Sequence, residues 1–124
     1  MHKVFVYGTL LKGERNDHYL KYAKRIEEKC WTIGKLFDTG YGYPAIKLLD
    51  EARVYGELYE VSDSDLFEWD ELEEYTEGAK DNLYDRVVRP IMIEEGTTSA
   101  YVYVAARGSL LNRRIDSGDW RINQ

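Results

Sequence analysis

The 124-residue sequence has a single cysteine, Cys30, and only two histidines, His2 and His18. One cysteine excludes an internal disulfide framework and a structural zinc site built on thiolates. The two histidines lie well apart in sequence, so no metal site with several histidine ligands is expected. No apolar run approaches the ~20 residues of a membrane span, and the residues after Met1 lack the layout of a signal peptide. These absences predict a cytoplasmic protein without a metal site.

Positive charge is also scarce. Lysines and arginines number 17 against 23 aspartates and glutamates, which gives a formal net charge of −6. Because the chain has no long Lys/Arg block, neither a nucleic acid nor an anionic membrane is an expected partner. The hydrophobic share of 44% is typical of a globular chain and excludes wholesale disorder. The length suits one domain that covers residues 1–124.

Short strand patterns dominate the chain, and glycine-containing turns separate them. Strands are expected at residues 3–7, 31–37, 45–49, 53–61, 84–93 and 99–106, with a hairpin loop at 94–98. A surface helix is expected within 13–30 and a clearer helix at 63–75. Gly56, inside a strand pattern, indicates a bulge or a close approach of another backbone. Many strands and few helices in mixed order predict an α+β fold with a mostly antiparallel sheet or small barrel.

The second predicted helix has one carboxylate on its apolar side. Leu66, Trp69 and Leu72 share a face, and Glu73 lies four residues after Trp69 and seven after Leu66. A charge there costs several kcal/mol unless it is paired or reaches a polar cavity. In one interpretation, Arg86 or a tyrosine hydroxyl satisfies the carboxylate. In the other, Glu73 is a partly desolvated general acid/base with a raised pKa.

The first predicted strand ends in the turn Gly8-Thr9-Leu10. Backbone N–H groups at a glycine turn can converge on a carboxylate or a developing oxyanion. A glycine also lets a ligand approach the backbone closely, although an ordinary strand-to-loop glycine is the alternative interpretation. The spacings GxxxxGK[ST] and GxGxxG are both absent, so the turn is not predicted to bind phosphate.

Three motifs follow one another along the chain: Val4-Phe5-Val6-Tyr7-Gly8-Thr9-Leu10, Asp70-Glu71-Leu72-Glu73 and Tyr84-Asp85-Arg86. In this order they resemble the γ-glutamylcyclotransferase-like family, which includes AIG2-like and γ-glutamylamine cyclotransferases. Tyr43-Pro44-Ala45 and Ser117-Gly118-Asp119-Trp120 extend the resemblance over nearly the whole chain. The resemblance implies a compact mixed β-barrel with packed helices. It also implies an enzyme that cyclises a γ-glutamyl group to 5-oxoproline and releases the attached amine.

Carried over position by position, the resemblance makes Glu73 the catalytic glutamate. The substrate-binding residues that it implies are Tyr7, Gly8, Thr9, Leu10, Tyr84 and Arg86. In the expected reaction Glu73 takes a proton from the substrate α-ammonium and returns it to the departing amine, with no metal or organic cofactor. The partner is then a small γ-glutamyl molecule. Residues 74–83 form a stretch longer than in many members of the family, and it borders the leaving group.

Three alternatives compete with this function. A catalytically silent small-ligand-binding module on the same fold would keep the Gly8–Leu10 turn without needing a basic carboxylate. Removal of a γ-glutamyl protecting group in a biosynthetic pathway would use the same cyclisation with a different leaving amine. A protein-interaction module would have an exposed apolar patch and no cavity beside Glu73. The sequence sets neither the leaving amine nor the oligomeric state.

Overall fold

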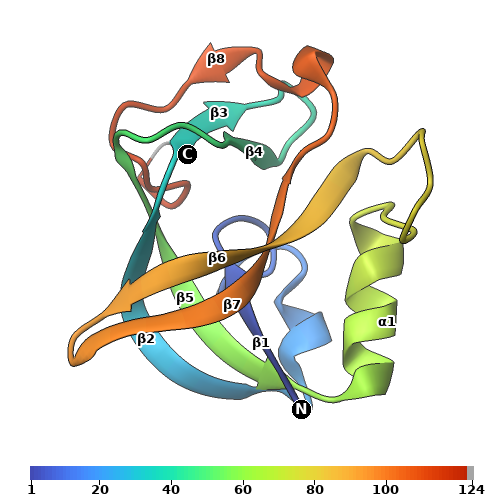
Figure 1. Ribbon diagram of the computed structural model, residues 1–124, viewed down its shortest axis with the longest axis vertical. Coiled ribbons are helices and arrows are strands. Elements are labelled where there is room, and N and C mark those ends of the chain that lie inside the picture. The colour runs from blue at the N-terminus through green and yellow to red at the C-terminus, as the bar shows by residue number, and fades with distance from the viewer. Residues whose placement is uncertain (123–124) are drawn as a thin grey trace.

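The computed structural model describes residues 1–122, and a closed five-stranded barrel forms most of it (Figure 1). Around the barrel the order is β1 (His2–Val6), β5 (Arg53–Val61), β2 (Lys24–Ile33), β6 (Tyr84–Ile93) and β7 (Gly96–Ala105). Neighbouring strands are antiparallel except β1 and β7, which are parallel. The predicted fold class, an α+β fold with a mostly antiparallel mixed barrel, is confirmed.

Two further units flank the barrel. A small sheet has the order β4 (Pro44–Lys47), β3 (Lys35–Asp38) and β8 (Arg113–Arg114). Helix α1 (Asp63–Leu72) lies alongside the barrel, and Figure 1 shows both units in one view, with the small sheet at the top and α1 at the right. Single 3₁₀ turns occur at Asp17–Leu20 and Gly108–Leu110. No helix within residues 1–122 is long and apolar enough to cross a membrane.

The surface helix expected within residues 13–30 is wrong. A 3₁₀ turn at Asp17–Leu20 is all the helix that forms there, and β2 begins at Lys24. Residues 24–33 pair with β5, with register shifts between Arg25 and Glu27 and between Glu27 and Cys30. Each paired residue of β5 lies at least twenty residues downstream, so tertiary contacts override the local helical spacing.

Both faces of β1 are buried over its last three residues, Val4 to Val6. Phe5 points into a core cluster that also contains Leu58, Ile91 and Val102 from three other strands. Its neighbours Val4 and Val6 point the other way, into a cluster that includes Leu66 and Trp69 of α1. The second cluster therefore fastens α1 to the barrel and places the end of this helix beside the end of β1.

Gly56 marks a close approach of two backbones, as one of its two interpretations predicted. A Cβ at this position would lie 2.1 Å from the carbonyl oxygen of Val6 and 2.8 Å from the Phe5 ring. The next residue, Glu57, is buried and accepts hydrogen bonds from the backbone N–H of Lys12 (3.0 Å) and the Tyr59 hydroxyl (2.8 Å). Strand β5 thus holds both ends of the turn that follows β1.

Cys30 lies in the core cluster of Phe5. Burial raises the pKa of its thiol to about 12, with the negative charges of Glu27 and Glu57 adding to the shift. The thiol donates to the carbonyl oxygen of Gly56 at 3.4 Å. The side chain therefore acts as a packed apolar group rather than as a nucleophile.

Candidate active site

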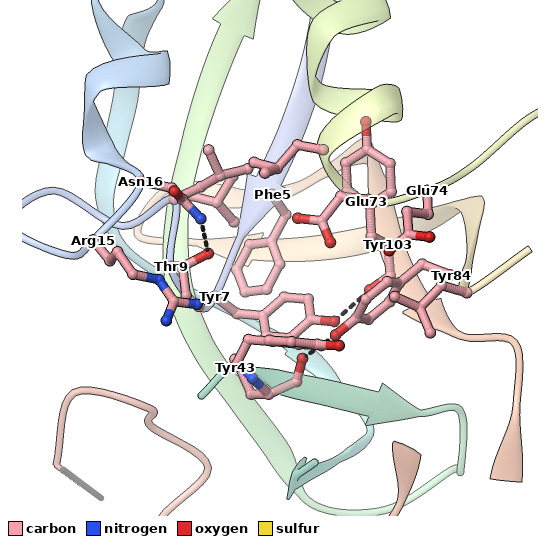
Figure 2. Close-up of a pocket in the computed structure, with 16 residues that line it drawn as sticks. Phe5, Tyr7, Thr9, Arg15, Asn16, Tyr43, Glu73, Glu74, Tyr84 and Tyr103 are labelled. Carbon is pink, nitrogen blue, oxygen red and sulfur yellow. Dashed lines mark hydrogen bonds between the residues drawn. The ribbon is translucent and has the colours of Figure 1, made fainter. Parts of the chain in front are cut away.

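A pocket of about 180 Å³ lies where the turn after β1 meets the end of α1 (Figure 2). At ~30 Å³ per water molecule, this volume suits an organic group of several heavy atoms. The residues that line it are Phe5, Val6, Tyr7, Gly8, Thr9, Leu10, Arg15, Asn16, Tyr43, Pro44, Leu72, Glu73, Glu74, Leu83, Tyr84 and Tyr103. A cavity beside Glu73 counts against the protein-interaction alternative, which required that none exist.

Glu73 enters the pocket from the C-cap of α1. Its backbone N–H donates to the carbonyl oxygen of Trp69 at 3.0 Å, so the last turn of the helix fixes its position. Figure 2 shows its carboxylate directed toward the space between the turn and the tyrosines. Burial raises the pKa of this carboxyl to about 7. A group with that pKa is suited to accept and return a proton near neutral pH.

The Glu73 carboxylate is bound by neither of the candidate partners from the sequence, Arg86 and a tyrosine hydroxyl. Arg86 forms its ion pair with Asp70 instead, and the tyrosines around the pocket donate elsewhere. Among residues 1–122, no hydrogen bond or ion pair to the Glu73 carboxylate occurs. The interpretation that Arg86 or a tyrosine hydroxyl satisfies the carboxylate is therefore wrong.

Three buried tyrosines form a neutral wall of the pocket. The Tyr7 hydroxyl donates to the carbonyl oxygen of Tyr103 at 2.5 Å, and the Tyr84 hydroxyl donates to that of Pro44 at 2.5 Å. Burial is the largest cause that raises the pKa of Tyr7 and Tyr84 far above the usual value, and the negative charge of Glu73 adds to both shifts. These phenols therefore stay protonated, and their donor capacity is already used within the protein.

The turn after β1 lines the same pocket, and three of its backbone N–H groups have no hydrogen-bond partner among residues 1–122. Leu11 donates its N–H to the carbonyl oxygen of Gly8 at 3.0 Å, and Asn16 holds Thr9 through its backbone N–H and its side-chain amide. Within residues 1–122, no hydrogen bond uses the backbone N–H groups of Gly8, Thr9 or Leu10. Backbone N–H groups without a partner can bind a carboxylate or an oxyanion.

The side of Gly8 that lacks a side chain faces Pro44. A Cβ there would lie 2.8 Å from both Cγ and Cδ of the proline ring. Gly8 thus lets the turn pack against the start of β4, a requirement that neither sequence interpretation included.

Arg86 lies behind the pocket wall rather than in it. One guanidinium nitrogen is 2.5 Å from a carboxylate oxygen of Asp70, and the other oxygen of Asp70 accepts from the Tyr103 hydroxyl at 2.7 Å. The guanidinium also stacks on Tyr101 and Tyr75, with 4.4 Å and 5.1 Å to the ring centroids. The expected substrate-binding role of Arg86 is corrected accordingly: its contacts anchor the end of α1, and it does not line the pocket.

Asp70→Asn is expected to reduce the free energy of unfolding by about 3 kcal/mol, because it leaves a largely buried guanidinium without an anion. Urea denaturation measures the change. Glu71→Gln is the matched control, since the neighbouring side chain is exposed and its loss should change stability by less than about 0.5 kcal/mol. Equal effects of the two substitutions would show that the ion pair with Arg86 contributes little.

The predicted residues Tyr7, Gly8, Thr9, Leu10, Glu73 and Tyr84 all line one pocket. Sequence reasoning missed Arg15, Asn16, Tyr43 and Tyr103, which line it too. Asn16 returns to the site only through the turns after residue 10, and Tyr103 only through the pairing of β7 with β1. No local pattern signals either contact. In residues 1–122 no group of three or more His, Cys, Asp or Glu side chains is arranged to hold a metal ion.

Comparison with known proteins agrees with this site. The sequence profile of the family described as "Gamma-glutamyl cyclotransferase, AIG2-like" matches residues 4–122. The chain therefore belongs to the γ-glutamyl cyclotransferase, AIG2-like family, and it is an enzyme of this kind. It is 43% identical over 122 residues to the γ-L-glutamyl-butirosin B γ-glutamyl cyclotransferase of Niallia circulans. This match covers 98% of this chain and 76% of that protein.

Two further relatives extend the comparison. The γ-glutamylcyclotransferase family protein YtfP of Escherichia coli K12 is 30% identical over 118 residues, 95% of each chain. The crystal structure of YkqA from Bacillus subtilis superposes with a TM-score of 0.80 at 30% identity. That match covers 99% of this chain but 40% of the YkqA chain, so the fold described here is part of a longer protein there.

Proposed function

We propose that this protein converts the γ-glutamyl group of a small γ-glutamyl amine to 5-oxoproline and releases the amine. The observation that carries the proposal is the unpaired Glu73 carboxylate, with its pKa raised to about 7, in one pocket with the free N–H groups of residues 8–10. The relative from Niallia circulans, named for a γ-glutamyl substrate, supports this substrate class.

The proposed reaction uses Glu73 twice. Its carboxylate first takes a proton from the substrate α-ammonium, and the freed nitrogen attacks the γ-carbonyl carbon to close a five-membered ring. The bond from that carbon to the leaving nitrogen then breaks as Glu73 returns the proton to this nitrogen. The ring nitrogen loses a second proton, which the released amine takes up to leave as its ammonium form. One carboxyl suffices because the two transfers are sequential, and each is favoured by a pKa near the working pH.

The turn after β1 supplies the complementary half of the site. The N–H groups of Gly8, Thr9 and Leu10 would hold the substrate α-carboxylate or stabilise the oxyanion that forms at the γ-carbonyl. Holding the glutamyl chain folded brings the amine to its own carbonyl, and such oriented intramolecular attack reaches effective molarities of ~10⁵ M or more. The neutral tyrosine wall excludes water and competes for neither the proton nor the carboxylate.

The pH dependence tests the role of Glu73. The base acts when ionised, so kcat/KM for 5-oxoproline release should be level above about pH 7 and fall about tenfold per unit below it. Glu73→Gln should remove this acid limb from whatever activity is left. A profile that stays flat to about pH 5 would show that the base has an ordinary carboxyl pKa and is not this one.

A coupled assay for 5-oxoproline separates the proposal from its strongest rival. It would be run across γ-glutamyl amines, γ-glutamyl dipeptides and ε-(γ-glutamyl)lysine. The proposed enzyme turns over at least one of these classes. A silent binding module on the same fold would bind 5-oxoproline in the same pocket but would form none from any of these substrates.

A further inference from the structure

Glu74 occupies a backbone conformation that disfavours its residue type. Its φ is 53°, and among residues 1–122 only Ala52, at 69°, is another non-glycine residue with positive φ. The residue after a helix C-cap often adopts this conformation, but it is then usually glycine. A side chain there costs roughly 1 kcal/mol, and such strain persists where the surroundings impose it, often at functional sites.

The fold itself makes no use of the Glu74 carboxylate. The backbone of the residue is fully engaged, since its N–H donates to Glu71 at 3.1 Å and its carbonyl accepts from Leu83 at 3.3 Å. Its side chain is exposed and makes no hydrogen bond or ion pair with any other of residues 1–122. A glycine would therefore serve the backbone better, and the carboxylate calls for another explanation.

The carboxylate lies at the pocket beside aromatic rings. Glu74 lines the same pocket as Glu73, and its negative charge is the second cause, after burial, that raises the pKa of Tyr43. The Tyr43 ring stacks on that of Tyr41, with 6.2 Å between centroids. A pocket lined by both a carboxylate and phenol rings is an environment that attracts an organic cation. Figure 2 shows the cationic Arg15 on the opposite side of the pocket, near Thr9.

The chemistry at Glu73 directs the leaving amine toward Glu74. The leaving nitrogen must reach the Glu73 carboxyl to receive its proton. The direction of the leaving group follows from the first of the two roles proposed for the N–H groups of the turn, in which they hold the α-carboxylate. The remainder of the leaving group therefore extends on the Glu73 side of the pocket, where Glu74 follows directly in the chain.

We propose that Glu74 and Tyr43 form the leaving-amine subsite and favour leaving amines that carry a second positive charge, such as an aliphatic diamine. The inference rests on the proposed cyclisation and goes further by naming the class of leaving group. It also explains why a strained glutamate occupies a position that suits glycine.

Two substrates of equal length test the subsite: the γ-glutamyl monoamide of 1,4-diaminobutane, and γ-glutamyl-n-pentylamide, in which a methyl group replaces the ammonium. Glu74→Gln keeps the size of the side chain and removes its charge. It should lower kcat/KM for the cationic substrate about fivefold relative to the neutral one, the size expected of an exposed ion pair. The preference of the wild type should also weaken at high salt.

Glu74→Gly separates selectivity from backbone strain. It should lose the same preference while the unfolding midpoint rises by about 3 °C, because the strain is relieved. Ala52→Gly is the matched control: it relieves the other positive φ at an exposed site outside the pocket lining. Its midpoint should rise similarly, and its selectivity between the two substrates should equal that of the wild type.

The outcomes distinguish this inference from the proposed function. Wild-type enzyme that uses both substrates equally, or Glu74→Gln that slows both equally, would overturn the subsite and leave the cyclisation intact. If the wild type releases 5-oxoproline from neither, nor from any substrate class of the coupled assay, the proposed function fails. The subsite is then tested by calorimetry of both compounds binding to Glu73→Gln. Tighter binding of the cationic compound that is lost when Glu74→Gln is added supports the subsite. Equal binding of the two compounds refutes the subsite.

Discussion

Glu73→Gln is expected to lower kcat for 5-oxoproline release by about 10³-fold, the scale of general acid and base catalysis by one group. Glutamine has the shape of glutamate but can neither accept the ammonium proton nor return it to the leaving amine. The pocket and the donors of residues 8–10 are unchanged, so 5-oxoproline should still bind. Steady-state rates and calorimetry of product binding measure the two properties. Turnover at the wild-type rate would remove Glu73 from the mechanism.

Glu73→Gln lowers activity but should raise the free energy of unfolding, and the raised pKa of Glu73 sets the sign of this effect. Burial moves the pKa of Glu73 from 4.5 to about 7, so the folded state disfavours the ionised form. The resulting destabilisation of the wild type is absent below about pH 4.5, grows between the two pKa values and is complete above about pH 7. Glu73→Gln should therefore be more stable than wild type by up to about 3 kcal/mol at pH ~8, and equal to it at pH ~4. Lower stability at pH ~8 would show that the glutamine disrupts the pocket.

Gly56→Ala is expected to reduce the free energy of unfolding by about 3 kcal/mol or more, at the upper end of what an overpacked core loses. The added Cβ would overlap the Val6 carbonyl oxygen, at 2.1 Å, so backbone rather than a flexible side chain must move. Val6 lies two residues before Gly8, the first residue of the turn that carries the free N–H groups. Displacement of β1 from β5 should therefore also lower kcat/KM, even at temperatures where the variant stays folded.

Urea denaturation and the 5-oxoproline assay measure both effects of Gly56→Ala. Gly108→Ala is the control, because a Cβ there meets nothing within 4 Å and its φ is not positive. That variant should lie within about 0.5 kcal/mol of wild type. If Gly56→Ala is equally mild, the close approach of β1 and β5 does not constrain the fold.

Strands that show a clear apolar pattern within their own residues were predictable from the sequence. The expected ranges 53–61 and 84–93 coincide with β5 and β6. The first was predicted from alternation over nine residues and the second from its content of strand-forming residues. The second predicted helix forms but ends at Leu72 rather than at residue 75, since Glu74 turns into the left-handed region. The segment before Cys30 was mispredicted because its strand depends on a distant partner.

The candidate site divides in the same way. Glu73 was found because a carboxylate on an apolar helix face is a local anomaly that the sequence displays. The partner of Arg86 was not found, because Asp70 and Arg86 meet only after α1 packs against β6 and β7. The role of Tyr103 was also hidden, since its hydroxyl contacts the helix and its carbonyl contacts Tyr7 of the turn. Such bridging contacts are properties of the assembled barrel.

The sealed thiol of Cys30 has a practical consequence for following the pocket in solution. It is the one cysteine of the chain, it lies in the barrel core, and its pKa is about 12. Thiolates attack maleimide reagents, and a thiol with this pKa stays protonated near neutral pH, so the native protein should resist labelling. Tyr41 is exposed and its ring stacks on that of Tyr43, which lines the pocket. In Tyr41→Cys a single fluorophore would attach at this position, and its emission would report ligand binding in the pocket without labelling of Cys30.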